Sequence, residues 1–143
     1  MLDYCDEFKK LEKLKPDWNS YGSNPPNELA LQNGRLMILY LLLNGLEPDK
    51  ISPDAEDGIA IYLCKGRKRV WISCFNSGWM GCCCYFTNER EVSSPIIWEF
   101  ENLFDNNHIE KIKSYLEKGT ICSNELASVE HKEAVKTHLQ KSL

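Results

Sequence analysis

The sequence lacks an apolar run long enough to cross a membrane. Its longest near-continuous apolar stretch, from Leu36 to Leu43, is far shorter than the ~20 residues that a transmembrane helix needs. The chain begins with the acidic segment MLDYCDE, whereas a secretory signal peptide begins with basic residues. We therefore expect a soluble, cytoplasmic protein that does not associate with a membrane.

Catalytic and cofactor motifs of high specificity are lacking as well. The chain contains no GxGxxG, P-loop, HExxH or GxSxG pattern, which are typical of dinucleotide, nucleotide, zinc-protease and serine-hydrolase sites. Its carboxylates fall in expected loops and strand ends, where acidic side chains are normally solvated, and no pair stands out for acid–base chemistry. The sequence thus predicts a protein that is not an enzyme and that uses no cofactor.

The numbers of basic and acidic residues are also nearly balanced. The 17 Lys and Arg residues face 21 Asp and Glu residues, a net charge of −4, which disfavours tight non-specific binding of duplex nucleic acid while leaving room for a local basic patch. A length of 143 residues, of which 43% are hydrophobic, fits one domain whose core needs neither disulfides nor a metal. We expect this domain to span residues 1–120, followed by a C-terminal helical extension over 121–143.

The seven cysteines do not form a disulfide or zinc pattern. Their number is odd, no CxxC pair is present, and all three histidines lie in the final third of the chain. Cys82, Cys83 and Cys84 are consecutive, and successive side chains of a strand point to opposite faces, so the three cannot converge on one ion. Cys74 could join Cys82 and Cys84 in a site, but we interpret them as buried thiols, with redox sensing as a further alternative, and predict no metal.

Hydrophobic periodicity predicts an α+β fold. The first helix is expected over about residues 3–14, and a second, over about 25–43, starts at the cap Asn24. The second half of this helix is apolar on every side, which is typical of a helix buried in the fold or in a subunit interface. From residue 58 the period changes to two, which predicts an antiparallel three- to four-stranded β-meander packed with N-terminal and C-terminal helices. The expected strands are 59–64, 69–75, 79–86 and 96–100, the last beginning at a sheet edge because of Pro95.

Two expected segments follow the sheet. A helix is predicted between Asp105 or Asn106 and Gly119. From Ser123 a weaker amphipathic stretch follows, with apolar residues on one side. Three alternatives are open for it: it packs on the domain, it frays, or it becomes ordered when a partner binds. Those apolar residues are Leu126, Val129, Val135 and Leu139.

Turn lengths predict the strand register, and the register separates two faces of the sheet. A turn at residues 65–68 places Ile61 opposite Ile72, and a three-residue turn ending at Gly78 places Phe75 opposite Trp79. One face is then apolar core, which Met80, Cys82, Cys84 and Phe86 join. The other carries five aromatic side chains: Tyr62, Trp71, Phe75, Trp79 and Tyr85.

The aromatic side of the sheet has several interpretations. In one interpretation helices cover both faces of the sheet, or the apolar helix covers one face and the terminal helices cover the other. Alternatively, the aromatic side is a binding surface for another protein, including a second copy of the chain, because contiguous exposed apolar area marks interaction sites. A basic turn beside it would also suit single-stranded RNA or DNA, whose bases stack on aromatic rings. The basic residues of that turn are Lys65, Arg67, Lys68 and Arg69.

A polar loop between the first two helices carries a recognisable motif. The segment Trp18-Asn19-Ser20-Tyr21-Gly22 is followed by Pro25, and Pro53 precedes Asp57-Gly58-Ile59. Over roughly residues 17–86 the chain resembles a group of small bacterial and phage proteins with a W-[DN]-[SG]-Y-G-x-x-P loop, a helix and a P-x-x-D-G-x-I strand start. The resemblance implies an accessory protein of mobile or defence-related segments and assigns no catalytic residue.

The aromatic residues of this loop are expected to have a structural role. Trp18 and Tyr21 are interpreted as anchors that fix the loop, with Trp18 mostly buried against the helices or the sheet margin. Gly22 permits a turn conformation, and Asn19 or Ser20 can bond backbone groups.

The function that we favour from the sequence is binding of another protein, as an antitoxin, an inhibitor or an assembly factor does. The alternative is a single-stranded RNA- or DNA-binding module that uses the aromatic sheet face and the basic turn.

Overall fold

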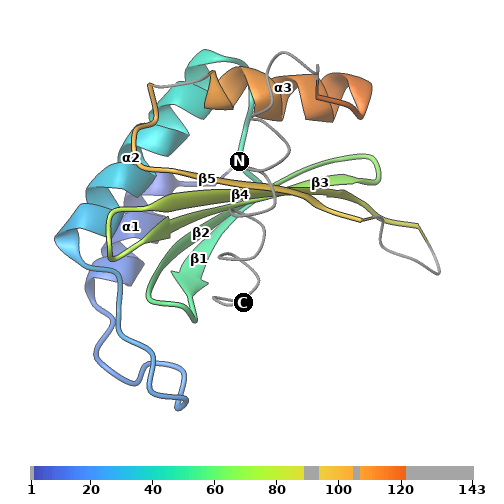
Figure 1. The fold of residues 1–143 in the computed structure, drawn as a ribbon. Helices are drawn as coiled ribbons and strands as arrows, with labels where there is room; N and C mark the ends of the chain where they lie inside the picture. The colour runs from blue at the N-terminus through green and yellow to red at the C-terminus, as the bar shows by residue number, and fades with distance from the viewer. Residues whose placement is uncertain (1, 89–93, 105–106, 122–143) are drawn as a thin grey trace.

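A five-stranded antiparallel sheet with three helices on one side makes up the part of the chain that the computed structural model describes, residues 2–88, 94–104 and 107–121 (Figure 1). Each strand pairs with its neighbour in sequence, in the order β1-β2-β3-β4-β5, so the predicted α+β meander is confirmed with one strand more than expected. The elements in chain order are α1 (Tyr4–Glu12), α2 (Glu28–Leu43), β1 (Lys50–Asp54), β2 (Gly58–Lys65), β3 (Lys68–Phe75), β4 (Met80–Phe86), β5 (Ile96–Phe100) and α3 (His108–Lys118).

The start of α2 differs from the prediction. Asn27, rather than Asn24, is the N-cap, and its side chain accepts a hydrogen bond from the backbone N–H of Ala30 at 2.9 Å. Asn24 lies three residues earlier and bonds to Asp57 instead. The side chain of Asn24 is thus engaged with Asp57, and α2 begins three residues later than predicted.

The predicted register of the central strands is confirmed. Ile61 lies opposite Ile72 in the β2–β3 pair, and the backbone N–H of Phe75 donates to the carbonyl oxygen of Trp79 at 2.9 Å across the β3–β4 turn. The strand missing from the prediction is β1, which pairs with β2 at the sheet edge. It contains Pro53, and proline is tolerated in an edge strand, where its missing N–H costs no ladder hydrogen bond.

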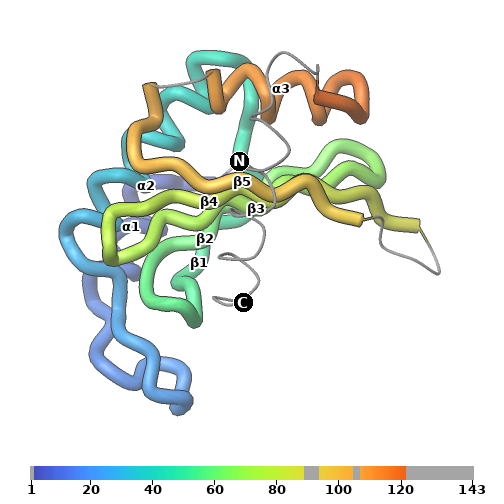
Figure 2. Tube along the Cα trace, in the orientation of Figure 1, coloured from blue at the N-terminus to red at the C-terminus, as the bar shows by residue number. Residues whose placement is uncertain are grey.

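All three described helices pack on the same face of the sheet (Figures 1 and 2). The core there joins buried residues of α1, α2 and α3 to the strands. The expectation that terminal helices cover the opposite face from α2 is therefore wrong for the described residues. An apolar sheet face of this size accommodates several helices side by side, and the sequence alone does not assign a helix to a face.

The core face includes most of the strand cysteines, as predicted. Cys74, Cys82 and Cys84 are almost fully buried. Phe86 belongs to the same face by register, opposite Lys68, but is 41% exposed.

The helix α3 ends at Gly119 as predicted, in a left-handed conformation with φ of 76°. The expected caps Asp105 and Asn106 and the amphipathic stretch from Ser123 lie outside the described residues. Within the described part of the chain, no helix combines the length and apolar character that crossing a membrane requires.

Candidate binding surface

The sheet face opposite the helices carries the five predicted aromatic residues, which we call the aromatic face: Tyr62, Trp71, Phe75, Trp79 and Tyr85. Tyr62 and Trp71 are cross-strand partners, and their rings stack with centroids 5.6 Å apart and an interplanar angle of 28°. Trp79 is 39% exposed, and the other four are partly buried. The sequence thus predicted correctly which residues share this face.

The indole nitrogen of Trp71 is in an unusual environment. Its indole N–H is buried and has no hydrogen-bond partner among the described residues. A buried donor without a partner costs free energy that a carbonyl or carboxylate acceptor would recover. This N–H is therefore a candidate contact for a bound group.

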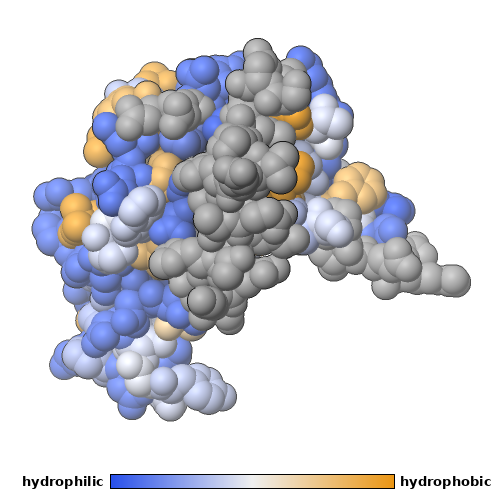
Figure 3. All heavy atoms as spheres, in the orientation of Figure 1, coloured by the Kyte–Doolittle hydropathy of each residue, from blue (hydrophilic) through white to orange (hydrophobic). Residues whose placement is uncertain are grey.

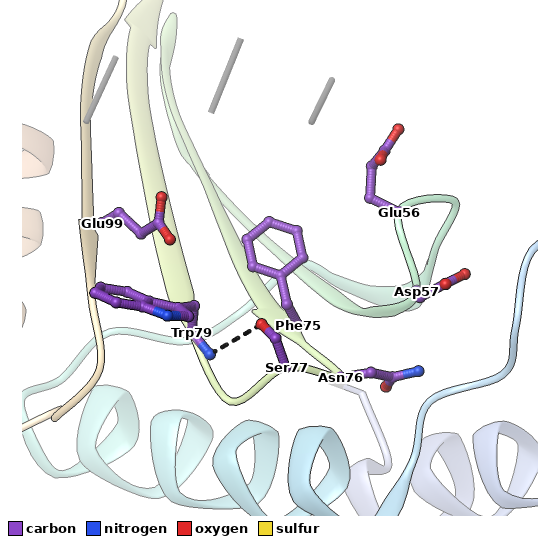
Figure 4. A pocket seen from close by; sticks show the side chains of 7 residues that line it. All are labelled: Glu56, Asp57, Phe75, Asn76, Ser77, Trp79 and Glu99. Atoms are coloured by element: carbon purple, nitrogen blue, oxygen red, sulfur yellow. Dashed lines mark hydrogen bonds between the residues drawn. The ribbon is translucent and has the colours of Figure 1, made fainter. Parts of the chain in front are cut away.

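A hollow of about 250 Å³ lies at one end of the aromatic face. In Figure 4 the ring of Phe75 lies between Trp79 and Glu99 on one side and Glu56 on the other. Two aromatic rings and three acidic residues line this cavity, which we call the acidic hollow, and the carboxylate of Asp57 points away from Phe75 in Figure 4. Its lining residues are Glu56, Asp57, Phe75, Asn76, Ser77, Trp79 and Glu99.

A second hollow, of about 270 Å³, lies beside the stacked pair and brings the polar loop to the aromatic face. Trp18 lines it together with Tyr62 and Trp71. We call it the Trp18 hollow. A narrow cleft lined by Trp71, Phe75 and Ile97 lies between the two hollows, so apolar surface continues across the sheet.

The basic turn is less uniform than predicted. Lys65 and Arg67 are exposed, but the ammonium of Lys68 donates to the carbonyl oxygen of Leu116 in α3 at 2.7 Å. Arg69 donates to the carbonyl oxygens of Gly66 and Lys68 at 2.6 Å and 3.1 Å. Lys68 therefore points to the helix side of the sheet, and the predicted four-residue basic patch is divided between two faces.

The loop that contains Trp18 is fixed by its polar residues. Asn19 accepts hydrogen bonds from the backbone N–H groups of Tyr21 and Ser23, and Gly22 adopts the left-handed φ of 83°, as predicted for these two positions. Trp18 is partly buried at the sheet margin. Tyr21, however, is 91% exposed, so its interpretation as an anchor is wrong, because the hydrogen bonds of Asn19 already close the turn.

Two residues that tie this loop to the sheet were not identified from the sequence. Asp57 accepts hydrogen bonds from the backbone N–H and the side-chain amide of Asn24, at 2.7 Å and 3.1 Å. Asn76, in the β3–β4 turn, accepts two hydrogen bonds from Asn27, one from its backbone N–H and one from its side-chain amide, and donates a third to the carbonyl oxygen of Pro25. The available signal was weak, since both residues stand in ordinary turn sequences before a glycine.

Among the described residues, neither the buried strand cysteines Cys74 and Cys83 nor the buried His108 resembles an activated catalytic group. Burial raises the pKa of Cys74 to about 12 and that of Cys83 to about 11, so both remain protonated thiols near neutral pH. Burial, with a contribution from Lys111, lowers the pKa of His108 to about 4. His108 lies on the helix side, where it accepts a hydrogen bond from the indole N–H of Trp98 at 3.1 Å. No group of three His, Cys, Asp or Glu residues within the described ranges could hold a metal ion.

The two parts of the motif noted in the sequence contact each other, through Asn24 and Asp57 and through a 2.7 Å hydrogen bond from Ser23 to the carbonyl oxygen of Ala55. In this chain Pro53 and Asp57 are four residues apart, one more than the P-x-x-D pattern has. No protein-family model, curated protein or solved structure matches the chain. The resemblance therefore remains a prediction.

Proposed function

We propose that this protein is a non-enzymatic accessory protein that binds another protein through the aromatic face. The proposal is supported by the adjoining Trp18 hollow, cleft and acidic hollow, which share Trp71 and Phe75 and lie on the side of the sheet that no described helix covers. Aromatic side chains are enriched in protein interfaces because they bury much area at a low entropic cost. The role that we expect of such binding is that of an antitoxin, an inhibitor or an assembly factor, and the resemblance adds a mobile or defence-related bacterial or phage system as its setting.

The charges around the face define the partner further. Glu56, Asp57 and Glu99 line one end, while the exposed Lys65 and Arg67 stand at the turn at the other end. A partner segment with apolar side chains in its middle and a lysine or arginine at one end would match this distribution. The cation would lie against the ring of Trp79 or Phe75, where cation–π attraction adds to that of the carboxylates.

The same charges favour a protein over a nucleic acid. A single strand that stacked along the face would bring its phosphates close to the carboxylates of the acidic hollow. Two of the four basic residues, Lys68 and Arg69, already donate to backbone carbonyls. The stacked Tyr62–Trp71 pair remains the feature that supports the RNA or DNA alternative.

A binding role also fits the chemistry of the face better than a catalytic one. Cys82 and Cys83 line the cleft between the hollows. Burial raises the pKa of both thiols, which keeps them from acting as thiolate nucleophiles. The histidine with a perturbed pKa, His108, is engaged with Trp98 on the opposite side of the sheet.

Co-expression with the products of neighbouring genes tests the proposal. We expect one of them to co-purify with the wild-type chain, to be lost with Trp79→Ala and to be retained with Tyr21→Ala. Trp79 and Tyr21 are both exposed aromatic residues, so the second variant is a matched control for the loss of a ring.

A single-stranded RNA oligonucleotide forms the second arm of this experiment. We expect no binding at low salt. The nucleic-acid alternative replaces the proposal if the RNA binds, if its affinity falls steeply as the salt concentration rises, and if Lys65→Ala/Arg67→Ala abolishes the binding. If no neighbouring product binds, or if one binds the wild type and Trp79→Ala equally, the proposal is wrong.

A further inference from the structure

The outer side of α2 carries a stripe of exposed leucines. Leu29, Leu36, Leu39 and Leu43 are 41–69% exposed. Together with Gln32 they recur at alternating intervals of three and four residues, which is the spacing of the contact positions in a two-helix seam. We call Leu29, Gln32, Leu36, Leu39 and Leu43 the leucine stripe.

The leucine stripe is not needed for the core of the domain. The opposite side of α2 already packs on the sheet through six buried residues: Ala30, Leu31, Gly34, Met37, Ile38 and Leu41. The helix therefore has two apolar faces, one of which is satisfied within the chain. This explains why its sequence shows no polar face.

A hollow of about 270 Å³ lies next to the stripe. Asn33 and Leu36 border it on α2, and Phe104 borders it on the segment after β5. Phe104 is 64% exposed and packs edge-on against Tyr40 with ring centroids 5.0 Å apart. In Figure 3 hydrophobic surface is visible at the upper left, over α2 and the neighbouring segment 101–104.

We propose that the leucine stripe binds the same stripe of a second copy of this chain, so that the protein is a two-fold symmetric dimer with paired α2 helices. In a two-helix seam each contact side chain inserts between residues of the facing helix, and an identical α2 helix presents its leucines at the matching spacing. A two-fold interface uses one patch on both subunits, as a single stripe per chain requires. A leucine of the partner helix would fill the hollow beside Leu36.

The size of the patch fits a stable dimer. Six apolar side chains that are each 40–69% exposed lie together there, the leucines of the stripe with Leu42 and Phe104. Apolar patches of roughly several hundred Å², the size that such exposed fractions give, are often functional. Two such patches with their polar rims reach the roughly 1,200–2,000 Å² that specific interfaces bury.

The charges of α2 favour a protein partner over a lipid surface. The helix contains two charged residues, Glu28 and Arg35, whereas a helix that lies on a membrane carries many lysines and arginines on its polar side. Arg35 already forms an ion pair with Glu12 of α1 and lies 5.0 Å from the ring centroid of Phe8. Pairing the helices therefore leaves no unpaired charge of Arg35 in the interface.

Light scattering coupled to size exclusion, with sedimentation equilibrium, tests the dimer on the full chain. We expect the wild type to have twice the 16.5 kDa mass of one chain. Leu39→Glu/Leu43→Glu should weaken association by about a hundredfold or more and give a folded monomer, because carboxylates would have to be buried in an apolar seam. Leu39→Ser/Leu43→Ser should weaken it in the same direction, and circular dichroism checks folding of both.

The controls separate this interface from the aromatic face. Tyr21→Glu adds a charge at an exposed ring elsewhere and should leave the dimer intact, as should Trp79→Ala. A wild-type chain that stays monomeric at high micromolar concentration would overturn the dimer. So would a dimer that survives the α2 variants but is lost with Trp79→Ala, since the second copy would then occupy the aromatic face.

Discussion

Asn24 donates two hydrogen bonds to Asp57, one to each carboxylate oxygen, across 33 residues of sequence. This pair joins the polar loop of Trp18 to the turn between β1 and β2. Because Trp18 lines a hollow with Tyr62 and Trp71, the position of the loop also shapes one end of the aromatic face. The interaction is thus both a structural tie and a determinant of the proposed binding surface.

Asp57→Asn should lower the free energy of unfolding by about 1–2 kcal/mol, because the amide keeps a neutral acceptor for one hydrogen bond from Asn24 and presents an NH2 donor where the other had its acceptor. Asparagine tolerates the left-handed φ of 64° at this position, so backbone strain is not added. Urea denaturation measures the change. Glu56→Gln, one residue earlier and exposed, is the matched control and should have no effect; equal effects of the two variants would contradict the role of Asp57.

Gly58→Ala should be severely destabilising, by about 3 kcal/mol or more. A Cβ atom at Gly58 would lie 2.2 Å from the carbonyl oxygen of Cys74 in the backbone of the neighbouring strand, and a backbone atom paired in a sheet cannot move aside easily. Thermal unfolding measures the loss. For comparison, Gly66→Asn places a side chain where the structure leaves open space and should be nearly neutral; a Gly58→Ala variant as stable as the wild type would contradict the register.

The stability of the fold should decrease as the pH falls from about 6.5 to about 4. His108 has a pKa lowered from 6.5 to about 4 by burial and by Lys111, so below pH 6.5 the unfolded chain binds a proton that the folded chain does not. The folded state loses up to about 3 kcal/mol relative to the unfolded state across this window. The contribution is fully present above pH 6.5.

The measurement is the free energy of unfolding in urea between pH 4 and pH 7 for the wild type and for His108→Gln. Glutamine can accept the hydrogen bond of Trp98 but does not titrate. We expect a shallower pH dependence for the variant. The same slope in both proteins would show that other groups cause the acid sensitivity.

The cysteines should differ in reactivity toward a thiol reagent in the native protein. Cys5 and Cys64 are exposed and should react quickly, whereas Cys74, Cys82 and Cys84 are buried and should react only after unfolding. Ellman's reagent follows the reaction in a Cys122→Ser background, which removes the cysteine outside the described residues. Fast reaction of the buried thiols without denaturant would contradict the packing of β3 and β4.

The sheet was predictable from the sequence because short turns determine which residues face each other. The turn at Lys65–Lys68 fixed the pairing of Ile61 with Ile72, and with it the membership of the aromatic face. By contrast, β1 carries a proline and charged residues, and edge strands tolerate both, so its alternation was not visible.

The contacts between distant segments were not predictable. Nothing in the local sequence of Asn24 or Asp57 shows that the two side chains meet, so Asn24 was interpreted as a helix cap. The side of the sheet that each helix covers was also undetermined, because α2 is apolar on both its inner and its outer face. Its buried Met37 and its exposed Leu39 have the same character in the sequence and different surroundings in the fold.

The central claim is that the aromatic face binds a protein partner, and its most direct test is a calorimetric titration of the co-purifying partner into the wild type, Trp79→Ala and Tyr21→Ala. We expect Trp79→Ala to weaken binding by about tenfold or more, which corresponds to about 1.4 kcal/mol, and Tyr21→Ala to bind as the wild type does. Equal affinity of all three proteins would contradict the claim and place the binding site elsewhere on the molecule.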